Sequence, residues 1–448
     1  MASAFVSDKV LVDGLIRPAT VLVAAGVVTA IRPGVDTAGA AVVHDFSGRT
    51  LLPGLVDAHV HLNEPGRTEW EGFATGTRAA ASGGVTTVID MPLNAIPPTT
   101  TEANLDTKLA AARGQCHVDV GFWGGLVPGN RGDLRALVAR GVRGFKGFMI
   151  ESGVDEFPAV SPADMDAAMA ELAGEPTLLM FHAEMDQPVA ACAAAPTTYE
   201  SFLRSRPDTF ETSALATIAE LSAKHPATPL HVVHLSSAEA VPILRDAQAA
   251  GLPISAETCF HYLYFRAEDI PDKGTHYKCC PPIRSTANQD VLWDALAAGV
   301  IQTVVSDHSP CTPELKDLAT GDFHKSWGGV SGLGLGLPIL WTEARKRGFS
   351  LAQVSAWTAA NTAKQVGLAG RKGTIAVGAD ADFVVFDENK PFVVGRENLV
   401  FKNKISPYEG AELTGTVEAT FVRGREVYSA AAGFAAPAGE LILERRTA

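Results

Sequence analysis

The stretch LLPGLVDAHVHLNEPGR, residues 51–67, joins an apolar run to two histidines that stand one residue apart. The apolar residues 51–56 predict a buried strand, and residues two apart on a strand point to the same side. His59 and His61 therefore face one way at the carboxyl end of this strand, where they can hold one metal ion. The alternative is a pair of histidines that only form hydrogen bonds, so the rest of the chain has to decide.

Seven further apolar runs of β character follow, and Ala-, Glu- and Leu-rich stretches with helical spacing separate most of them. Eight strands over about 320 residues are typical of an α/β fold of the TIM-like (β/α)8 barrel type, enlarged by insertions. A doubly wound open sheet is the competing architecture, but no G-x-G-x-x-G turn supports it. The eight runs cover residues 51–56, 85–91, 117–124, 142–148, 177–181, 229–235, 252–257 and 301–305.

The two ends of the chain differ from this middle. Short alternating strands, broken by glycines and a Pro-Gly pair, are expected within residues 1–50, and the same pattern returns after residue 372. Neither end is expected to bury enough surface to fold alone. The sequence therefore predicts a composite β-sandwich domain, residues 1–50 and 373–448, beside a barrel of residues 51–372.

Composition and charge argue against several classes of protein. The 448 residues are 46% hydrophobic and 19% charged, which is typical of a globular enzyme. A net charge of −13 without a basic cluster argues against nucleic acid or an anionic membrane as a partner. No run approaches the roughly 18 apolar residues of a membrane helix, and the first residues lack a signal-peptide pattern. The six cysteines have no paired spacing, so they predict reduced thiols in a cytoplasmic protein.

Chemically active residues close several of the predicted strands. In a (β/α)8 barrel, active groups gather at the carboxyl ends of the strands. Taken alone, a histidine there can be a core imidazole and an aspartate can be a helix cap. Period two places His231 on the opposite face from its neighbour at 234, so it is expected to be structural. Four groups are expected on one rim with the histidine pair: Lys146, His182, His234 and Asp307.

Lys146, in GVRGFKGF, is the unusual member of this set. An ammonium group at the inner end of a barrel strand is costly to bury. One explanation is an ion pair with an acid such as Asp307. The other is that the amine has reacted with carbon dioxide to give a carbamate, an anionic group whose two oxygens can bridge two metal ions. The residues alone leave both explanations open.

Several motifs follow one another in order along the chain: GGVTTVIDMPLN, GFKGF, FHAE, HVVHLSS, CPPIR, SDHSP and the G-x-D-A-D of VGADADFVVF. Together with PGLVDAHVHLNEPGR they resemble the amidohydrolase superfamily over essentially the whole chain. Within it they resemble the cyclic amidases, which include allantoinases, hydantoinases, dihydropyrimidinases and dihydroorotases. The resemblance implies a hydrolase that opens a cyclic amide with the help of bound metal.

The resemblance also implies a role for each histidine on the rim. His59 and His61 would bind the first of two divalent metal ions, and His182 and His234 would bind the second. Nitrogen and oxygen ligands of this kind suit Zn²⁺, with Co²⁺, Mn²⁺ or Fe²⁺ as alternatives.

Two further residues complete the implied centre. Lys146, carboxylated by CO₂, would bridge both ions, and Asp307 would bind the first. Two ions that share a water lower its pKa toward roughly 7. Asp307 would take the proton of that water and deliver it to the departing ring nitrogen. Because all six positions hold the expected residue type, a non-catalytic dihydropyrimidinase-like scaffold protein is disfavoured.

Three positions distinguish the possible cyclic amides. Dihydroorotases typically place an arginine, which pairs with the substrate carboxylate, where this chain has Asn63. Hydantoinases and dihydropyrimidinases usually carry a tyrosine where this chain has Glu151. MPLN, ending at Asn94, and KISPYEG, residues 404–410, resemble the allantoinases. The resemblance therefore implies opening of the hydantoin ring of allantoin to allantoate in purine degradation, with other cyclic ureides as the alternative substrates.

Allantoin is a neutral molecule rich in N–H and C=O groups, so its site needs amide-type partners. Asn94 is expected either to contact it or to brace a loop. Backbone groups around Cys280, where the family more often has serine, and within residues 327–332 are expected to contact the ring.

Three more residues are candidates for contact with substrate. Asn63 and Arg67 are expected to brace the loop after the first strand or to touch the ureido arm. His308 either binds substrate or orients Asp307. The resemblance also implies a homo-oligomer, a dimer or a tetramer.

Overall fold

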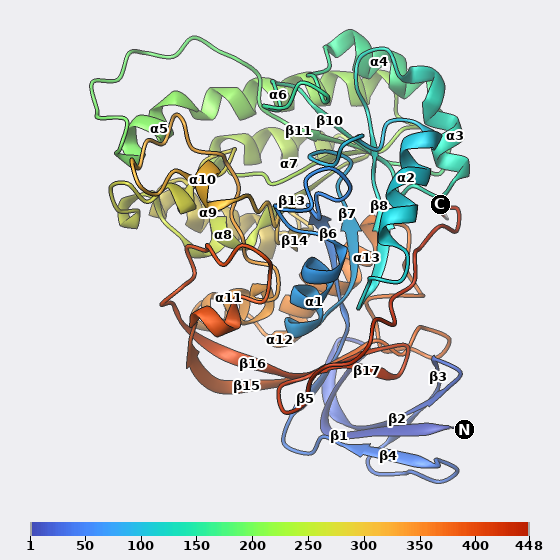
Figure 1. Ribbon diagram of the computed structural model, residues 1–448. Coiled ribbons are helices and arrows are strands. Elements are labelled where there is room, and N and C mark those ends of the chain that lie inside the picture. Colours follow the sequence, from blue (N-terminus) through green and yellow to red (C-terminus); the bar gives the residue numbers. More distant parts are fainter. Residues whose placement is uncertain (1, 447–448) are drawn as a thin grey trace.

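A computed structural model describes residues 2–446 of the chain (Figure 1). Met1, Thr447 and Ala448, the outermost residues of the predicted composite domain, lie outside the described residues. The middle of the chain forms a barrel with helices around it, and strands from both ends form a second layer below it (Figure 1).

The barrel consists of parallel strands in two ladders, one of three strands and one of six. The first and last strands meet through a parallel bridge between Val60 and His308, where the His61 amide donates to the His308 carbonyl at 2.9 Å. With β8 and β9 counted as one interrupted strand, eight strands close the ring, and the predicted (β/α)8 barrel is confirmed. The strands are β6 (Leu55–Val60), β7 (Val85–Asp90), β8 (Asp119–Phe122), β9 (Gly124–Gly125), β10 (Phe145–Phe148), β11 (Leu179–His182), β12 (Leu230–Val232), β13 (Ile254–Cys259) and β14 (Thr303–Val305).

Helices cover the outside of the barrel, and local capping residues start several of them. Ser161 and Asp164 form a reciprocal capping box at the start of α4, as Ser350 and Gln353 do at the start of α12. Among residues 2–446, no helix is both long enough and apolar enough to cross a membrane. The helices are α1 (Phe73–Ser82), α2 (Glu102–Ala112), α3 (Leu134–Ala139), α4 (Pro162–Glu171), α5 (Tyr199–Ser205), α6 (Asp208–Lys224), α7 (Val241–Ala249), α8 (Phe260–Tyr264), α9 (Thr286–Ala297), α10 (Pro313–Lys316), α11 (Gly336–Lys346), α12 (Leu351–Ser355) and α13 (Asn361–Gln365).

The predicted first strand, residues 51–56, is wrong as a single element. β5 (Thr50–Pro53) pairs with strands of the terminal sheet, and β6 of the barrel begins after Gly54. A Cβ atom at Gly54 would collide with the side chain of Thr86, so only glycine allows the chain to pass here. Both strands are apolar and buried, so the hydrophobic pattern does not change between them.

The two ends of the chain form one nine-stranded sheet that curls around its own core. The N-terminal half of β1 pairs with β4 and its C-terminal half pairs with β5, so the sheet divides at β1. Phe5 lies with its ring centroid 4.9 Å from that of Phe383 and 5.1 Å from that of Phe421. The predicted composite β-sandwich is thereby confirmed. Its strands are β1 (Ser3–Val12), β2 (Leu15–Ala24), β3 (Val27–Pro33), β4 (Val42–Asp45), β5, β15 (Phe383–Val393), β16 (Glu412–Val422), β17 (Arg425–Ser429) and β18 (Gly433–Phe434).

A buried cluster of charges joins the sandwich to the barrel. The Lys372 ammonium is fully buried, and its Nζ lies 2.6 Å from Asp119 of β8, 2.8 Å from Asp380 and 2.7 Å from Asp382. The two latter residues are the acids of the G-x-D-A-D motif, which therefore ties the start of β15 to the barrel. Because the three carboxylates surround the Lys372 ammonium, this group of acids is an ion-pair network and not a metal site.

The end of the described chain also lies against the barrel. Leu441 forms a parallel bridge with Val120 of β8, and the Glu440 amide donates to Asp119 at 2.8 Å. Figure 1 shows this tail beside β8. The domain boundaries at residues 50 and 373 stay predictions. Two segments cross them: β5 pairs with the sheet of the sandwich, and the C-terminal tail contacts the barrel.

Candidate metal centre

The carboxyl ends of the barrel strands surround a cavity of about 90 Å³. Six predicted metal ligands line it, supplied by five strands or by the residues that directly follow them. The structure thus brings the whole predicted set together, although residues of the first and last strands are far apart in sequence. The six are His59, His61, Lys146, His182, His234 and Asp307.

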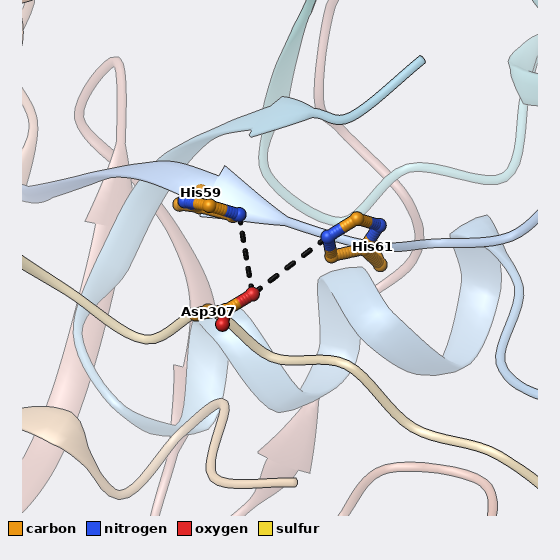
Figure 2. Close-up of side chains that lie close together, drawn as sticks. All are labelled: His59, His61 and Asp307. Atoms are coloured by element: carbon orange, nitrogen blue, oxygen red, sulfur yellow. Dashed lines mark ion pairs between the residues drawn. The ribbon is translucent and has the colours of Figure 1, made fainter. Parts of the chain in front are cut away.

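Three of these side chains form the first half of the centre (Figure 2). The Nε2 atom of His59 lies 3.1 Å from Oδ1 of Asp307, and Nε2 of His61 lies 3.7 Å from the same oxygen. Figure 2 shows both imidazoles directed toward the carboxylate. The three candidate ligand atoms lie within 4.8 Å of one another, close enough to share one ion.

The electrostatics of this half suit a metal ion. Burial raises the pKa of the Asp307 carboxyl, but the charge and hydrogen bond of His59 more than offset this and hold it well below its usual range. Burial lowers the pKa of His61 to about 3, so its imidazole is neutral. Burial also acts to lower the pKa of His59, but Asp307 and Glu257 raise it above its ordinary value. A cation is therefore favoured between these carboxylates, and a metal ion supplies one when neutral imidazoles bind it.

His182 and His234 form the second half. Their ring centroids lie 4.6 Å apart, and the His234 ring lies 5.5 Å from that of His59. Burial lowers the pKa of both imidazoles well below the ordinary value, so both are neutral. The His182 ring also stacks on Phe148, with centroids 4.7 Å apart, which limits its rotation.

Several residues of the candidate site have a strained backbone. Positive φ angles are uncommon for residues other than glycine, although asparagine and aspartate accept them more readily. Each costs on the order of 1–3 kcal/mol, and such residues cluster where function requires a set geometry. Four predicted site residues adopt them: Asn63 (61°), Asn94 (61°), His234 (39°) and Asp307 (41°).

Two imidazole nitrogens indicate that a metal fits this cavity. Nδ1 of His234 is buried and has no hydrogen-bond partner among the described residues, and the buried Nε2 of His59 makes only the 3.1 Å ion-pair contact with Asp307. An unpartnered buried nitrogen costs about 1–3 kcal/mol, and coordination of a metal ion removes that cost. The opposite nitrogen of His59, Nδ1, lies 2.5 Å from Glu257, and Nε2 of His182 lies 2.6 Å from Glu184. Metal-binding histidines usually have such a carboxylate partner, which sets the tautomer and orients the ring.

Sequence reasoning missed the two carboxylate partners of the histidines, Glu257 and Glu184. Glu257 lies in β13, and its other oxygen is 3.1 Å from Nε2 of His231. His231 thus faces away from the cavity, as expected from its spacing. Burial raises the pKa of Glu184, whereas His59 and His231 outweigh burial and lower that of Glu257. Glu184 stands two residues after His182 in the FHAE motif, which was a signal for its role, but Glu257 has no such signal.

Lys146 is fully buried at the inner end of β10. Burial lowers the pKa of its ammonium to about 8. The ammonium lies 5.0 Å from the centroid of the Phe148 ring. No carboxylate of the described residues forms an ion pair with it, so the expected alternative of a pair with Asp307 is not found. The amine is therefore free to react with carbon dioxide, which is the second explanation predicted from the sequence.

Two predicted substrate contacts line the cavity. Asn94 does so with its amide nitrogen 3.5 Å from Nδ1 of His61, and Cys280 does so with its thiol close to Gly328. The predicted loop 327–332 contributes Trp327, Gly328 and Gly329. The remaining lining residues, which the sequence did not indicate, are Leu93, Phe148, Ser152, Cys279 and Ser309.

Three other predicted substrate contacts lie outside the cavity lining, and their bonds favour a bracing role. The Asn63 amide donates to the Pro310 carbonyl at 3.5 Å. Arg67 donates to the Asn94 carbonyl at 2.8 Å, and so holds the loop that presents Asn94. His308 is fully buried, with Nε2 3.1 Å from Glu71 and with Nδ1 accepting from the amides of residues 332 and 333. Its ring therefore fastens the strand end that carries the aspartate.

The strand ends of this (β/α)8 barrel place histidines, a lysine and an aspartate around one cavity. This arrangement is typical of a class of barrel enzymes that are built around a metal centre. Residues 50–427 match the Amidohydrolase family. The chain belongs to that family, and the alternative of a non-catalytic scaffold protein is not retained.

Relatives are similar over the whole chain. The chain is 50% identical over 464 residues to the allantoinase of Saccharomyces cerevisiae, with 99% of each chain covered. It is 49% identical over 438 residues to the allantoinase of Streptomyces avermitilis, with 97% of each covered. The solved structure of an L-hydantoinase (dihydropyrimidinase) from Arthrobacter aurescens is 29% identical, covers 99% of both chains and superimposes with a TM-score of 0.94. The whole architecture, barrel and sandwich, is thus that of a solved structure.

Proposed function

We propose that this chain is an enzyme that opens the hydantoin ring of allantoin by hydrolysis and releases allantoate. The observation that carries the proposal is a cavity with six metal-type side chains whose remaining lining is uncharged. A substrate that bears a carboxylate, such as dihydroorotate, has no arginine partner among the described lining residues. A neutral ring with a ureido arm can form hydrogen bonds with the Asn94 amide, the hydroxyl groups of Ser152 and Ser309, and backbone groups of the lining. The two relatives that are named allantoinase support the same assignment.

Two divalent metal ions are part of the proposal, with His59 and His61 holding one and His182 and His234 the other. Neutral imidazoles and anionic oxygens suit Zn²⁺, and Co²⁺, Mn²⁺ or Fe²⁺ are the alternatives. When bound, such a pair of ions supplies Lewis acidity and activates water at neutral pH.

Lys146 is proposed to carry a carbamate. Its ammonium would first lose one proton. The neutral amine would then attack carbon dioxide, forming an N–C bond and releasing a second proton, so that the cation is replaced by an anion with two oxygens. Two features support this: burial lowers the pKa of the ammonium to about 8, and no carboxylate among the described residues pairs with it. A free ammonium at this position would repel metal ions, whereas a carbamate binds them.

Asp307 is proposed to hold the reacting proton. Its carboxylate is anionic, because burial acts to raise its pKa but His59 lowers it well below the usual range. The Ser309 hydroxyl donates to Oδ1 at 2.8 Å and helps to fix the carboxylate. The aspartate would accept a proton from the attacking water and then donate it to the leaving ring nitrogen, so one group serves as base and then as acid.

Asn94 is proposed to bind the polar edge of the substrate. Within residues 2–446 it is the one side-chain amide of the lining, and Arg67 holds its backbone in place. We further propose a homodimer or homotetramer in the cytoplasm. The six cysteines, all of them free thiols, are consistent with a reducing compartment.

A panel of cyclic amides tests the function. Metal-loaded protein is incubated with allantoin, hydantoin, dihydrouracil and dihydroorotate, and the ring-opened products are quantified. The proposal expects the highest kcat/KM with allantoin and none with dihydroorotate. Opening of dihydrouracil or hydantoin without opening of allantoin would favour the second candidate, a hydantoinase or dihydropyrimidinase, to which the similar solved structure points.

A further inference from the structure

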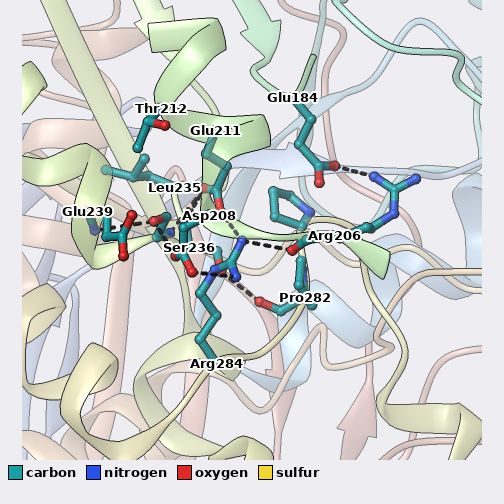
Figure 3. A network of polar contacts seen from close by, with 12 residues as sticks. Glu184, Arg206, Asp208, Glu211, Thr212, Leu235, Ser236, Glu239, Pro282 and Arg284 are labelled. Carbon is teal, nitrogen blue, oxygen red and sulfur yellow. Dashed lines mark hydrogen bonds and ion pairs between the residues drawn. The ribbon is translucent and has the colours of Figure 1, made fainter. Parts of the chain in front are cut away.

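Two arginine–glutamate pairs, each with a buried carboxylate, support the second half of the metal centre, and Figure 3 shows both pairs. Arg206 pairs with Glu184, and Arg284 pairs with Glu211. Both glutamates are buried and neither lines the cavity. A buried ion pair is weak support for stability as such, so these two pairs call for another explanation.

The first pair acts on His182. Oε2 of Glu184 lies 2.6 Å from Nε2 of His182 and 2.5 Å from a guanidinium nitrogen of Arg206. One carboxylate oxygen therefore accepts from the imidazole and from the arginine together. The Nε2–H of His182 is used in this bond, so Nδ1 is the nitrogen left for a metal ion.

The second pair acts on the turn that carries His234. Oε1 of Glu211 accepts from Arg284 at 2.8 Å. Its Oε2 accepts from the backbone amides of Ser236 and Ser237, at 2.9 and 3.0 Å. These amides follow His234 by two and three residues. Because His234 has a strained φ of 39°, the fixed turn after it is what keeps the ring in this position.

The two pairs belong to one short segment of the chain. Arg206 and Glu211 flank the beginning of α6, and the Arg284 guanidinium joins them by donating to the Arg206 carbonyl at 3.3 Å and by pairing with Asp208 at 3.2 Å. Figure 3 shows the Arg284 side chain directed toward the backbone of Arg206 and toward the carboxylates of Asp208 and Glu211. The start of α6 therefore supports both histidines of the second half.

The first half of the centre has a separate support. His59 donates to Glu257, and Glu257 is held by His231, with no arginine in the chain of contacts. None of these three residues contacts the Arg206–Glu184 pair. A change at the start of α6 should therefore reach one half of the centre and spare the other.

We propose that Arg206 and Glu211 are positioning residues that hold His182 and His234 for the second metal ion, and that the first ion binds without them. This inference rests on the proposed metal centre. Without Arg206, the buried Glu184 carboxylate lacks its cation, and the bond that orients His182 is lost. The affinity for the second ion should then fall by about 10–100-fold, the usual effect of removing such a partner.

Arg206→Gln tests the inference, since glutamine keeps length and polarity but removes the charge. Arg204→Gln is the matched control, because this neighbouring arginine pairs with Glu200 at the surface, where both side chains are at least 60% exposed. Metal content is measured by mass spectrometry over a range of buffered free Zn²⁺ concentrations, and the occupied positions are located by anomalous diffraction. Arg206→Lys, which retains the cation, should recover part of the affinity and serves as the test variant if the glutamine protein does not fold.

The expected result is two ions per chain in the unmodified protein and in Arg204→Gln. Arg206→Gln should hold one ion, at His59 and His61, at the same free Zn²⁺ and should bind the second only when free Zn²⁺ is raised about 10–100-fold. Equal binding of two ions by Arg206→Gln overturns the inference, and so does equal weakening of both sites. An unmodified chain that never holds two ions contradicts the proposed metal centre itself, which separates that failure from the failure of this inference.

Discussion

The buried amine of Lys146 leads to a quantitative prediction for assembly of the metal centre. Burial lowers the pKa of its ammonium from 10.5 to about 8. At pH 7 an amine with a pKa of about 8 is neutral in roughly one molecule in ten, whereas a pKa of 10.5 leaves roughly one in three thousand neutral. Only the neutral amine attacks CO₂. At equal intrinsic reactivity, the carbamate should therefore form about 300-fold faster than at an exposed lysine.

The sign of the pH dependence follows from the same pKa. The neutral fraction rises about tenfold per pH unit below the pKa and is nearly constant above it. Protein stripped of metal and CO₂ is mixed with Zn²⁺ and ¹³CO₂ at a constant concentration of dissolved gas. The rate at which the ¹³C carbamate signal appears is then measured between about pH 6 and pH 10. We expect the rate to rise steeply to about pH 8 and then to level off, in step with recovery of bound metal.

Lys146→Ala is the control, since it cannot form the carbamate. It should show no ¹³C signal and should lose the pair of bridged ions. A rate that keeps rising tenfold per pH unit up to about pH 10 would mean that burial does not lower this pKa. Full occupancy by two ions in Lys146→Ala would refute the carbamate as the bridging ligand.

Three further predictions concern single residues. In Asp307→Asn, kcat for allantoin at saturating metal should fall by about 10²–10⁴-fold with little change in the melting temperature, because the proton acceptor is lost; a steady-state assay that finds kcat within a few-fold of normal contradicts this. In Asn94→Ala, loss of one hydrogen bond, about 1 kcal/mol, should raise KM roughly fivefold while metal content stays at two, and an unchanged KM would remove Asn94 from the substrate site. In Lys372→Met, three carboxylates lose the lysine that they share; Asp119 and Asp380 keep Arg423 and Arg371, but the buried Asp382 is left without a cation, so denaturant titration should give a free energy of unfolding about 3–5 kcal/mol lower; an unaltered midpoint would show that the ion-pair network does not stabilise the junction.

Much of the site follows from local rules of sequence. His59 and His61 share a face because strand residues alternate, and the same alternation separates His234, which lines the cavity, from His231, which does not. The count of apolar runs predicts the barrel, and the barrel predicts that the strand ends converge. The ligand roles came from the family resemblance, because spacing alone left Lys146 with two explanations.

Other features depend on contacts between distant segments. Glu257 stands 198 residues from His59, and Arg284 stands 73 residues from Glu211, so neither partner can be paired by periodicity. Arg67 carries a charge beside the first strand, yet its role is set by the carbonyl of Asn94, which comes close only after folding. The break at Gly54 was missed since both strands around it are apolar.

The most direct test of the central claim is the dependence of allantoin opening on metal. Protein freed of metal and CO₂ is titrated with Zn²⁺ in the presence of CO₂, and the conversion of allantoin to allantoate is followed by NMR. The account predicts no conversion above the uncatalysed rate without metal and full activity at about two ions per chain. Conversion by the metal-free protein at the same rate, or no conversion of allantoin by protein that holds two ions, would contradict it.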